Sequence, residues 1–134
     1  DDRILSVDFH PDGKSFFVGT ERSHAIRFSL PEAAEMQRFK PDTADIPMQN
    51  KFGYPTARSV EISPDGKTLL TGSSDRTAFL FDLRTGKQIR KFKSDPGSCT
   101  SCSINARFSP SGEDILAGNM DSVFLCHWAI ATCR

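Results

Sequence analysis

The stretch VEISPDGKTLLTGS, residues 60–73, decides the fold of this chain. Its first half alternates apolar and polar residues, as a half-buried β-strand does, and an apolar run follows the Pro-Asp-Gly triplet at 64–66. Proline presets φ for the first central position of a turn, and aspartate and glycine accept the dihedral angles that follow. The stretch therefore predicts two strands joined by a tight turn.

The same pattern occurs twice more, as VDFHPDGKSFFVGT at residues 7–20 and as ARFSPSGEDILAGN at 106–119. The first two copies are offset by 53 positions, an offset that also relates Phe28 to Phe81 and Phe39 to Phe92. The third copy follows after 46 positions. Internal repetition at such a period is typical of a protein built from equivalent structural units.

Each unit predicts four strands, with the fourth at Met36–Lys40 in the first unit and at Ile89–Lys93 in the second. The one helix-prone stretch, 32–36, is too short for an isolated helix. Gly118 to Trp128 is one residue longer than Gly72 to Phe81, which predicts a bulge near Cys126. We predict an all-β chain with units at roughly residues 1–40, 57–93 and 102–134 and a connecting loop at 41–56.

The second unit resembles the WD-repeat β-propeller family. TGSSD at 71–75 is similar to the family's Ser-Gly-Ser-x-Asp turn, FDL at 81–83 stands where Trp-Asp-Leu is usual, and TGK at 85–87 resembles the next turn. The other units depart from the pattern, because Phe28-Ser29 and Trp128-Ala129 lack the aspartate and no unit has the family's Gly-His pair. A ring takes about four to eight blades. The resemblance therefore implies an incomplete propeller of about three blades, part of a larger chain, with incomplete blades at both ends.

The resemblance also implies a non-catalytic platform that binds other proteins. It gives Asp75 a structural role, bonding backbone amides of neighbouring turns. Four residues would lie near the loops of one propeller face, where partners commonly dock, and their side-chain types dominate interface energies: Arg22, Tyr54, Arg58 and Arg76. The alternative is that these arginines only keep the surface soluble.

Shorter motifs, among them FHPDG at 9–13 and DSV at 121–123, resemble the WD-repeat subunit of cleavage stimulation factor. That resemblance implies a nuclear protein of messenger-RNA 3′-end processing, with other 3′-end processing factors as partners. The alternative is a generic adaptor in ubiquitin-ligase, signalling or trafficking complexes, either cytoplasmic or nuclear.

Composition argues against several other functions. Seventeen basic and seventeen acidic residues cancel, so no broad positive field favours nucleic acid or an anionic membrane. The alternative is RNA binding along a basic strand that carries Arg84, Lys87, Arg90 and Lys91. We expect no membrane span, because no apolar run approaches the ~20 residues that a span needs. His10 and His24 lie far apart without a nucleophile motif, so we expect no catalytic site and no small-molecule substrate.

The four cysteines, at positions 99, 102, 126 and 133, all fall in the last third of the chain. A disulfide-stapled secreted domain would spread them, so we expect buried free thiols and an intracellular, reducing compartment. The pair Cys99/Cys102 with Cys126, His127 and Cys133 offers zinc ligands as an alternative. The chain has one Cys-x-x-Cys pair and lacks the second pair that would complete such a site, so we expect no metal and no cofactor.

Overall fold

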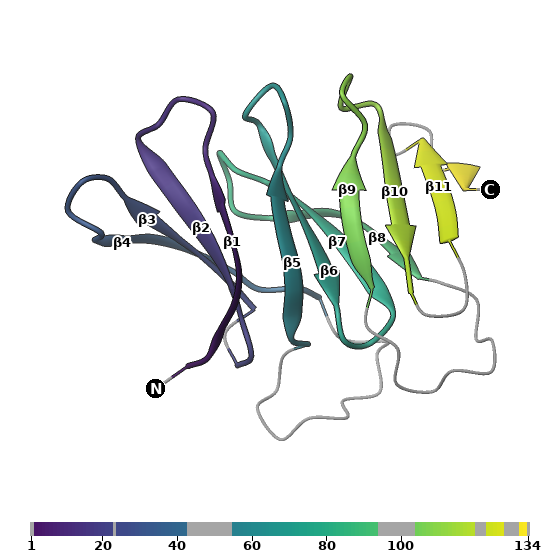
Figure 1. The fold of residues 1–134 in the computed structure, drawn as a ribbon, viewed down its shortest axis with the longest axis horizontal. Helices are drawn as coiled ribbons and strands as arrows, with labels where there is room; N and C mark the ends of the chain where they lie inside the picture. The colour runs from purple at the N-terminus through teal and green to yellow at the C-terminus, as the bar shows by residue number, and fades with distance from the viewer. Residues whose placement is uncertain are drawn as a thin grey trace.

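A computed structural model describes residues 2–22, 24–42, 55–93, 104–119, 123–127 and 132–133. These residues form three antiparallel sheets of four strands each, in which every strand pairs with its neighbours along the chain (Figure 1). The prediction of an all-β chain made of four-stranded units is therefore confirmed. No helix in the described ranges is long and apolar enough to cross a membrane.

The three sheets follow one another along the sequence. The first contains β1 (Ile4–Phe9), β2 (Ser15–Thr20), β3 (Ala25–Ser29) and β4 (Glu35–Phe39). The second contains β5 (Ala57–Ile62), β6 (Thr68–Ser73), β7 (Thr77–Asp82) and β8 (Gln88–Lys93). The third contains β9 (Asn105–Phe108), β10 (Asp114–Gly118), β11 (Val123–His127) and β12 (Thr132–Cys133).

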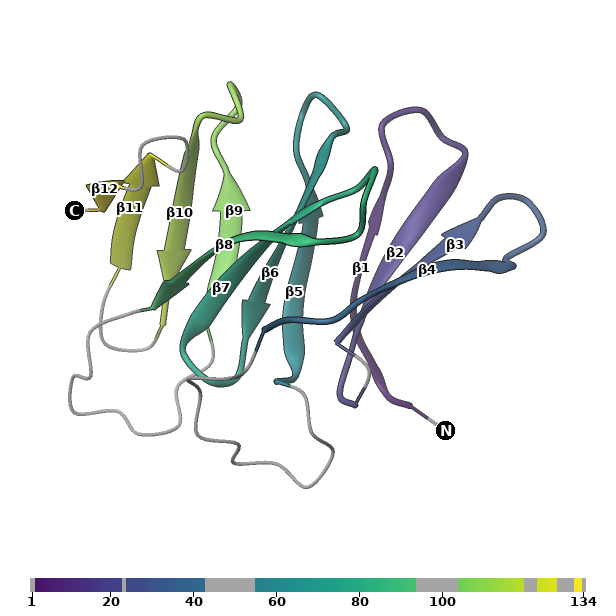
Figure 2. The same cartoon turned by 180° about the vertical axis from the view of Figure 1, so that it is seen from behind.

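The sheets stack face to face, as the view from behind shows (Figure 2). Between the first and second sheets, Phe17 and Phe39 pack with residues of the second sheet such as Leu69. Between the second and third sheets, a separate cluster includes Leu70 and Ile115. Burying a side chain of this size contributes about 1.5–3 kcal/mol, so apolar contact between sheets is the main source of stability.

Hydrogen bonds between the innermost strands repeat with the same offsets as the sequence. The amide of Ile62 in β5 donates to Asp8 Oδ2 in β1 at 3.0 Å. One sheet further on, the amide of Phe108 in β9 donates to Glu61 Oε1 in β5 at 3.1 Å. The repeat in the sequence is therefore also a repeat of the contact that joins one sheet to the next.

Two expectations for the ends of the chain are wrong. Neither end sheet lacks its fourth strand, because β4 pairs with β3 from Ala25 to Phe28 in the first sheet and β12 pairs with β11 in the third. Nor does β11 bulge near Cys126, since its register with β10 runs unbroken from Asp114↔His127 to Gly118↔Val123. Cys126 faces Ile115 as Phe81 faces Leu69, so Cys126 and not Trp128 is the equivalent of Phe81, and the chain from Gly118 to its partner Val123 is one residue shorter than that from Gly72 to Ala78. Trp128, the expected closing aromatic, lies outside the described residues.

Gly72 permits a close approach between the second and third sheets. A Cβ atom at this position would overlap the backbone carbonyl oxygen of Ile104 and the hydroxyl of Ser59. Gly19, at the equivalent place in β2, has the carbonyl oxygen of Ala57 and the hydroxyl of Ser6 in the same relation. The glycines that end these apolar runs are therefore required by backbone packing between sheets.

We expect Gly72→Ala to lower the free energy of unfolding by about 2–4 kcal/mol, because backbone atoms cannot yield as a flexible side chain can. The matched control is Gly13→Ala, where nothing lies within 4 Å of the added Cβ and only the positive φ of 70° opposes the change. That strain costs about 1 kcal/mol. Urea unfolding of both variants measures the difference, and equal losses would contradict the packing argument.

Candidate protein-interaction site

Three of the four predicted contact residues lie at one edge of the stacked sheets, which we call the arginine edge. Arg22 belongs to the turn from β2 to β3, Arg58 to the start of β5, and Arg76 to the turn from β6 to β7. These segments meet along the lower edge of Figure 1. Arg22 and Arg58 are exposed and Arg76 is half-buried. Tyr54 lies outside the described residues.

Thr56 fixes the turns of the two neighbouring sheets to one segment. Its hydroxyl donates to the carbonyl of Glu21 in the first sheet at 3.2 Å. Its own carbonyl accepts from the amide of Ser74 in the second sheet at 3.1 Å. Arg22 and Arg76 each lie within two residues of these bonds, so their backbones are held in a defined relation.

A β-bulge directs Arg58 to solvent. Ala57 pairs with Ser73 and Ser59 pairs with Gly72, so two steps along β5 oppose one step along β6 and Arg58 is the additional residue. Both of its neighbours are buried while Arg58 is exposed. Bulges of this kind are often found where a side chain must be re-aimed.

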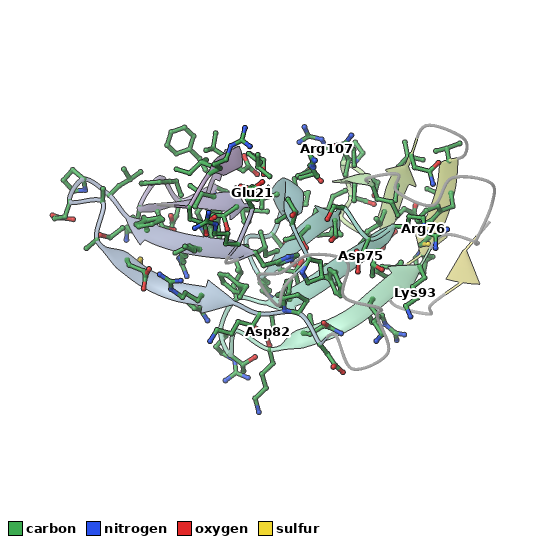
Figure 3. The ribbon with its side chains drawn as sticks, turned by 90° about the horizontal axis from the view of Figure 1, so that it is seen from below. Glu21, Asp75, Arg76, Asp82, Lys93 and Arg107 are labelled. Atoms are coloured by element: carbon green, nitrogen blue, oxygen red, sulfur yellow. The ribbon has the colours of Figure 1, made fainter. Side chains whose placement is uncertain are left out.

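Arg76 occupies a conformation that L-residues rarely adopt, with φ at 66°. Such a backbone costs about 1–3 kcal/mol and is retained where the surrounding structure imposes it. The preceding residue, Asp75, is half-buried, and its Oδ1 accepts from the amide of Thr77 at 3.2 Å. Burial raises the pKa of the Asp75 carboxyl above its usual value. Figure 3 shows Asp75 and Arg76 together on this edge, with Glu21 on the neighbouring sheet.

His24 joins the first sheet to the second directly behind the arginine edge. Its side chain has no solvent exposure. Nδ1 lies 2.7 Å from the carbonyl oxygen of Pro55, and Nε2 lies 2.8 Å from the hydroxyl of Thr71 in β6. A carbonyl only accepts, so Nδ1 carries the proton and Nε2 accepts from Thr71. The ring also meets that of Phe79 edge-on, with centroids 5.4 Å apart.

The burial of His24 lowers its pKa from 6.5 to about 4, although the hydrogen bond to Pro55 acts in the opposite direction. The imidazole is therefore neutral at pH 7. The sequence did not reveal the structural role of His24, because the equivalent residue of the second unit is Thr77 and the histidine is therefore not part of the repeat. The available signal was a lone histidine between two apolar strands, without a partner motif.

The other candidate chemistry does not assemble into a site. His10 lies 2.9 Å from Asp12 in the β1–β2 turn, and His127 of β11 lies 3.0 Å from Asp114 of β10, so the two pairs belong to different sheets. Within the ranges described above, no three histidine, cysteine, aspartate or glutamate side chains gather as metal ligands would.

Cys126 is buried, as expected, but it is disulfide-bonded, so the prediction of a free thiol is wrong at this position. The register of β11 with β12 places the backbone of Cys126 opposite that of Cys133, which the sequence spacing alone did not predict. A disulfide sulfur provides no thiolate, the form that zinc binds. Cys99 and Cys102 lie outside the described residues.

Comparison with known proteins agrees with this architecture. Residues 51–82 match the family model "WD domain, G-beta repeat". Protein groucho of Drosophila melanogaster is 28% identical over 124 residues, which are 91% of this chain and 15% of groucho. A ribosome biogenesis protein BOP1 homolog of Leishmania infantum is 30% identical over 83 residues, 57% of this chain and 10% of that protein. The crystal structure of the RRP9 WD40 repeats aligns with a TM-score of 0.79 at 15% identity, covering 100% of this chain and 38% of that chain.

Sheets of four antiparallel strands, stacked through their faces and linked along their inner strands, are the architecture of a β-propeller. The three sheets of this chain form an incomplete propeller, within which residues 51–82 match the WD-repeat model. The matched repeat at 51–82 covers β5 to β7 and contains the TGSSD motif at 71–75. The chain spans only a small part of the curated relatives that it matches, 15% in the case of groucho.

We expect the stability of the protein to fall as the pH drops from about 6.5 to about 4. In this window the unfolded chain takes up a proton at His24 that the folded protein does not accept. The lowered pKa of His24 corresponds to roughly 3 kcal/mol in the free energy of unfolding. This stability is fully present above the pKa of the unfolded state and is lost as the pH falls to the pKa of the folded state. Urea unfolding at a series of pH values measures this loss.

His24→Gln should lower the stability at pH 7, because the buried hydrogen bonds are disturbed, but flatten the pH dependence between about 6.5 and about 4. A dependence as steep as that of the unsubstituted protein would assign the effect to other groups. The histidine Cε1 proton resonance provides a direct titration of the ring.

Proposed function

We propose that this chain is a non-catalytic scaffold segment that binds a partner protein at the arginine edge. The observation that carries the proposal is the joint positioning of Arg22, Arg58 and Arg76 by one bulge and by the bonds of Thr56. Arginine is among the residues that contribute most to interface energies, and a backbone that is already ordered loses less entropy on binding. The guanidinium groups favour a partner surface that carries carboxylates, which arginine binds in bidentate geometry.

The identity of the complex to which this scaffold belongs is a second, more specific hypothesis. The motifs at 9–13 and 121–123 support a subunit of the messenger-RNA 3′-end processing machinery, as in cleavage stimulation factor, and hence a nuclear protein. Neither relative named above is that subunit, and the BOP1 homolog is named for ribosome biogenesis. A generic adaptor in ubiquitin-ligase, signalling or trafficking complexes is the alternative, in the cytoplasm or the nucleus.

Charge reversal at the arginine edge tests the binding face. We expect the double variant Arg22→Glu/Arg76→Glu, in the full-length protein, to reduce recovery of its main partner from nuclear or cytosolic extract by about tenfold or more, because two interface charges become repulsive. Quantitative mass spectrometry of the captured proteins measures the recovery.

The matched control is Lys14→Glu, a reversal of an exposed cation in the β1–β2 turn at the opposite edge of the first sheet. It should leave the captured proteins unchanged. Equal capture by the double variant and the unsubstituted protein would exclude the arginine edge. Recovery of 3′-end processing factors supports the more specific hypothesis, whereas ubiquitin-ligase, signalling or trafficking components would exclude it and leave the scaffold proposal standing.

A further inference from the structure

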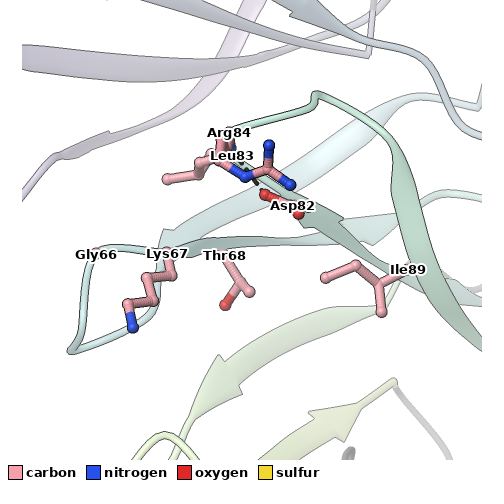
Figure 4. Close-up of a pocket in the computed structure, with 7 residues that line it drawn as sticks. All are labelled: Gly66, Lys67, Thr68, Asp82, Leu83, Arg84 and Ile89. Carbon is pink, nitrogen blue, oxygen red and sulfur yellow. Dashed lines mark hydrogen bonds between the residues drawn. The ribbon is translucent and has the colours of Figure 1, made fainter.

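A cavity of about 470 Å³ opens in the second sheet, at the edge opposite the arginine edge. It lies beside the β5–β6 turn, the end of β7 and the start of β8 (Figure 4). Pockets of roughly 300–1,000 Å³ accommodate small molecules and peptide side chains, so this one exceeds what a single ion fills. Its lining residues are Gly66, Lys67, Thr68, Asp82, Leu83, Arg84 and Ile89.

The apolar part of the wall comes from Leu83 and Ile89. Leu83 is 6% exposed and Ile89 is 42% exposed. Ile89 is the additional residue of a bulge, because Leu80 pairs with Arg90 and the next residue, Phe81, pairs with Gln88. The backbone therefore turns an isoleucine outward at the mouth of the cavity instead of into the core.

Thr68 contributes a buried hydroxyl that lacks a partner. The residue is 8% exposed, and its Oγ1 has no hydrogen-bond partner among the residues that the structure describes. The equivalent residue of the first sheet, Ser15, accepts from Arg27 Nε at 3.0 Å. At the position equivalent to Arg27, the second sheet has Leu80, whose side chain has no hydrogen-bond donor. A buried hydroxyl left in this way is costly unless a water molecule or a ligand bonds to it.

The charged part of the lining is net positive. Lys67 and Arg84 are both exposed cations. Asp82 is the one carboxylate of the lining, and its Oδ1 already accepts from the backbone amide of Arg84 at 2.8 Å. Figure 4 shows the Thr68 side chain between those of Lys67 and Ile89, so polar and apolar surfaces adjoin within the cavity.

We propose that this cavity binds a short acidic peptide segment of a partner protein. An aliphatic side chain of the segment contacts Leu83 and Ile89, a backbone carbonyl accepts from the Thr68 hydroxyl, and an adjacent carboxylate pairs with Lys67 or Arg84. An inorganic anion would leave the apolar wall uncovered, and a nucleic-acid phosphate would do the same. The site is separate from the arginine edge, so the two proposals can fail independently.

The test is a titration of the intact protein, methyl-labelled for NMR, with the synthetic peptide Ac-Glu-Asp-Leu-Leu-Asp-Glu-NH2. We expect saturable shifts of the Thr68, Leu83 and Ile89 methyl resonances. Arg84→Glu should weaken binding about tenfold or more, since an attraction becomes a repulsion. Thr68→Val should weaken binding several-fold without disturbing the fold, because a methyl group replaces a hydroxyl that has no partner in the free protein. Lys14→Glu, outside the cavity, should change nothing.

Several results would overturn the proposal. The absence of shifts at millimolar peptide would do so, as would equal affinity of the Arg84→Glu protein. The same shifts with Ac-Glu-Asp-Ser-Ser-Asp-Glu-NH2 or with inorganic phosphate would indicate an anion site without aliphatic recognition. The same shifts with an oligouridine RNA, weakening steeply with salt, would indicate nucleic-acid binding instead.

Discussion

Leu69 and Leu70 are adjacent in β6 and pack into two different cores, one on each side of the second sheet. Neighbouring residues of a strand point to opposite faces, so a sheet between two others must be apolar on both. All six residues of β6 are buried for this reason. The apolar run that follows the turn in the second unit is thus a direct consequence of stacking, and the glycine that ends it allows the next backbone to come close.

The same constraint explains why the outer faces of the stack differ from the inner ones. In β1, Val7 and Phe9 are 67% and 68% exposed, whereas their counterparts in β5, Val60 and Ile62, are 3% and 6% exposed. The residue types are similar and only the neighbour differs. Stability in such a stack is shared between each unit and its neighbours, so the second sheet is the best supported part of the chain.

The repeated pattern could be predicted from sequence because it reports backbone geometry: alternation gives strands, Pro-Asp-Gly gives turns, and a constant offset gives equivalent units. The placement of Arg22, Arg58 and Arg76 at one edge was implied by the family resemblance, which puts them near the loops of one propeller face. The contact of His24 with Thr71 could not be predicted, because it joins non-equivalent positions of two units. The unpartnered hydroxyl of Thr68 likewise depends on one difference between units: the residue that would bond it is Arg27 in the first unit and Leu80 in the second.

The bonds between inner strands also give the stack a direction. Asp8 accepts from the sheet that follows it, and Glu61 does the same for the next sheet. At the third equivalent position the chain has Arg107, whose guanidinium reaches back to Glu61 at 3.0 Å. Arginine has no acceptor to offer, so the series in which a carboxylate accepts from an amide of the following sheet ends at the third sheet. A sheet docked against β9 would find no carboxylate at this position to accept from its inner-strand amide, which makes the two outer faces of this stack chemically different from each other.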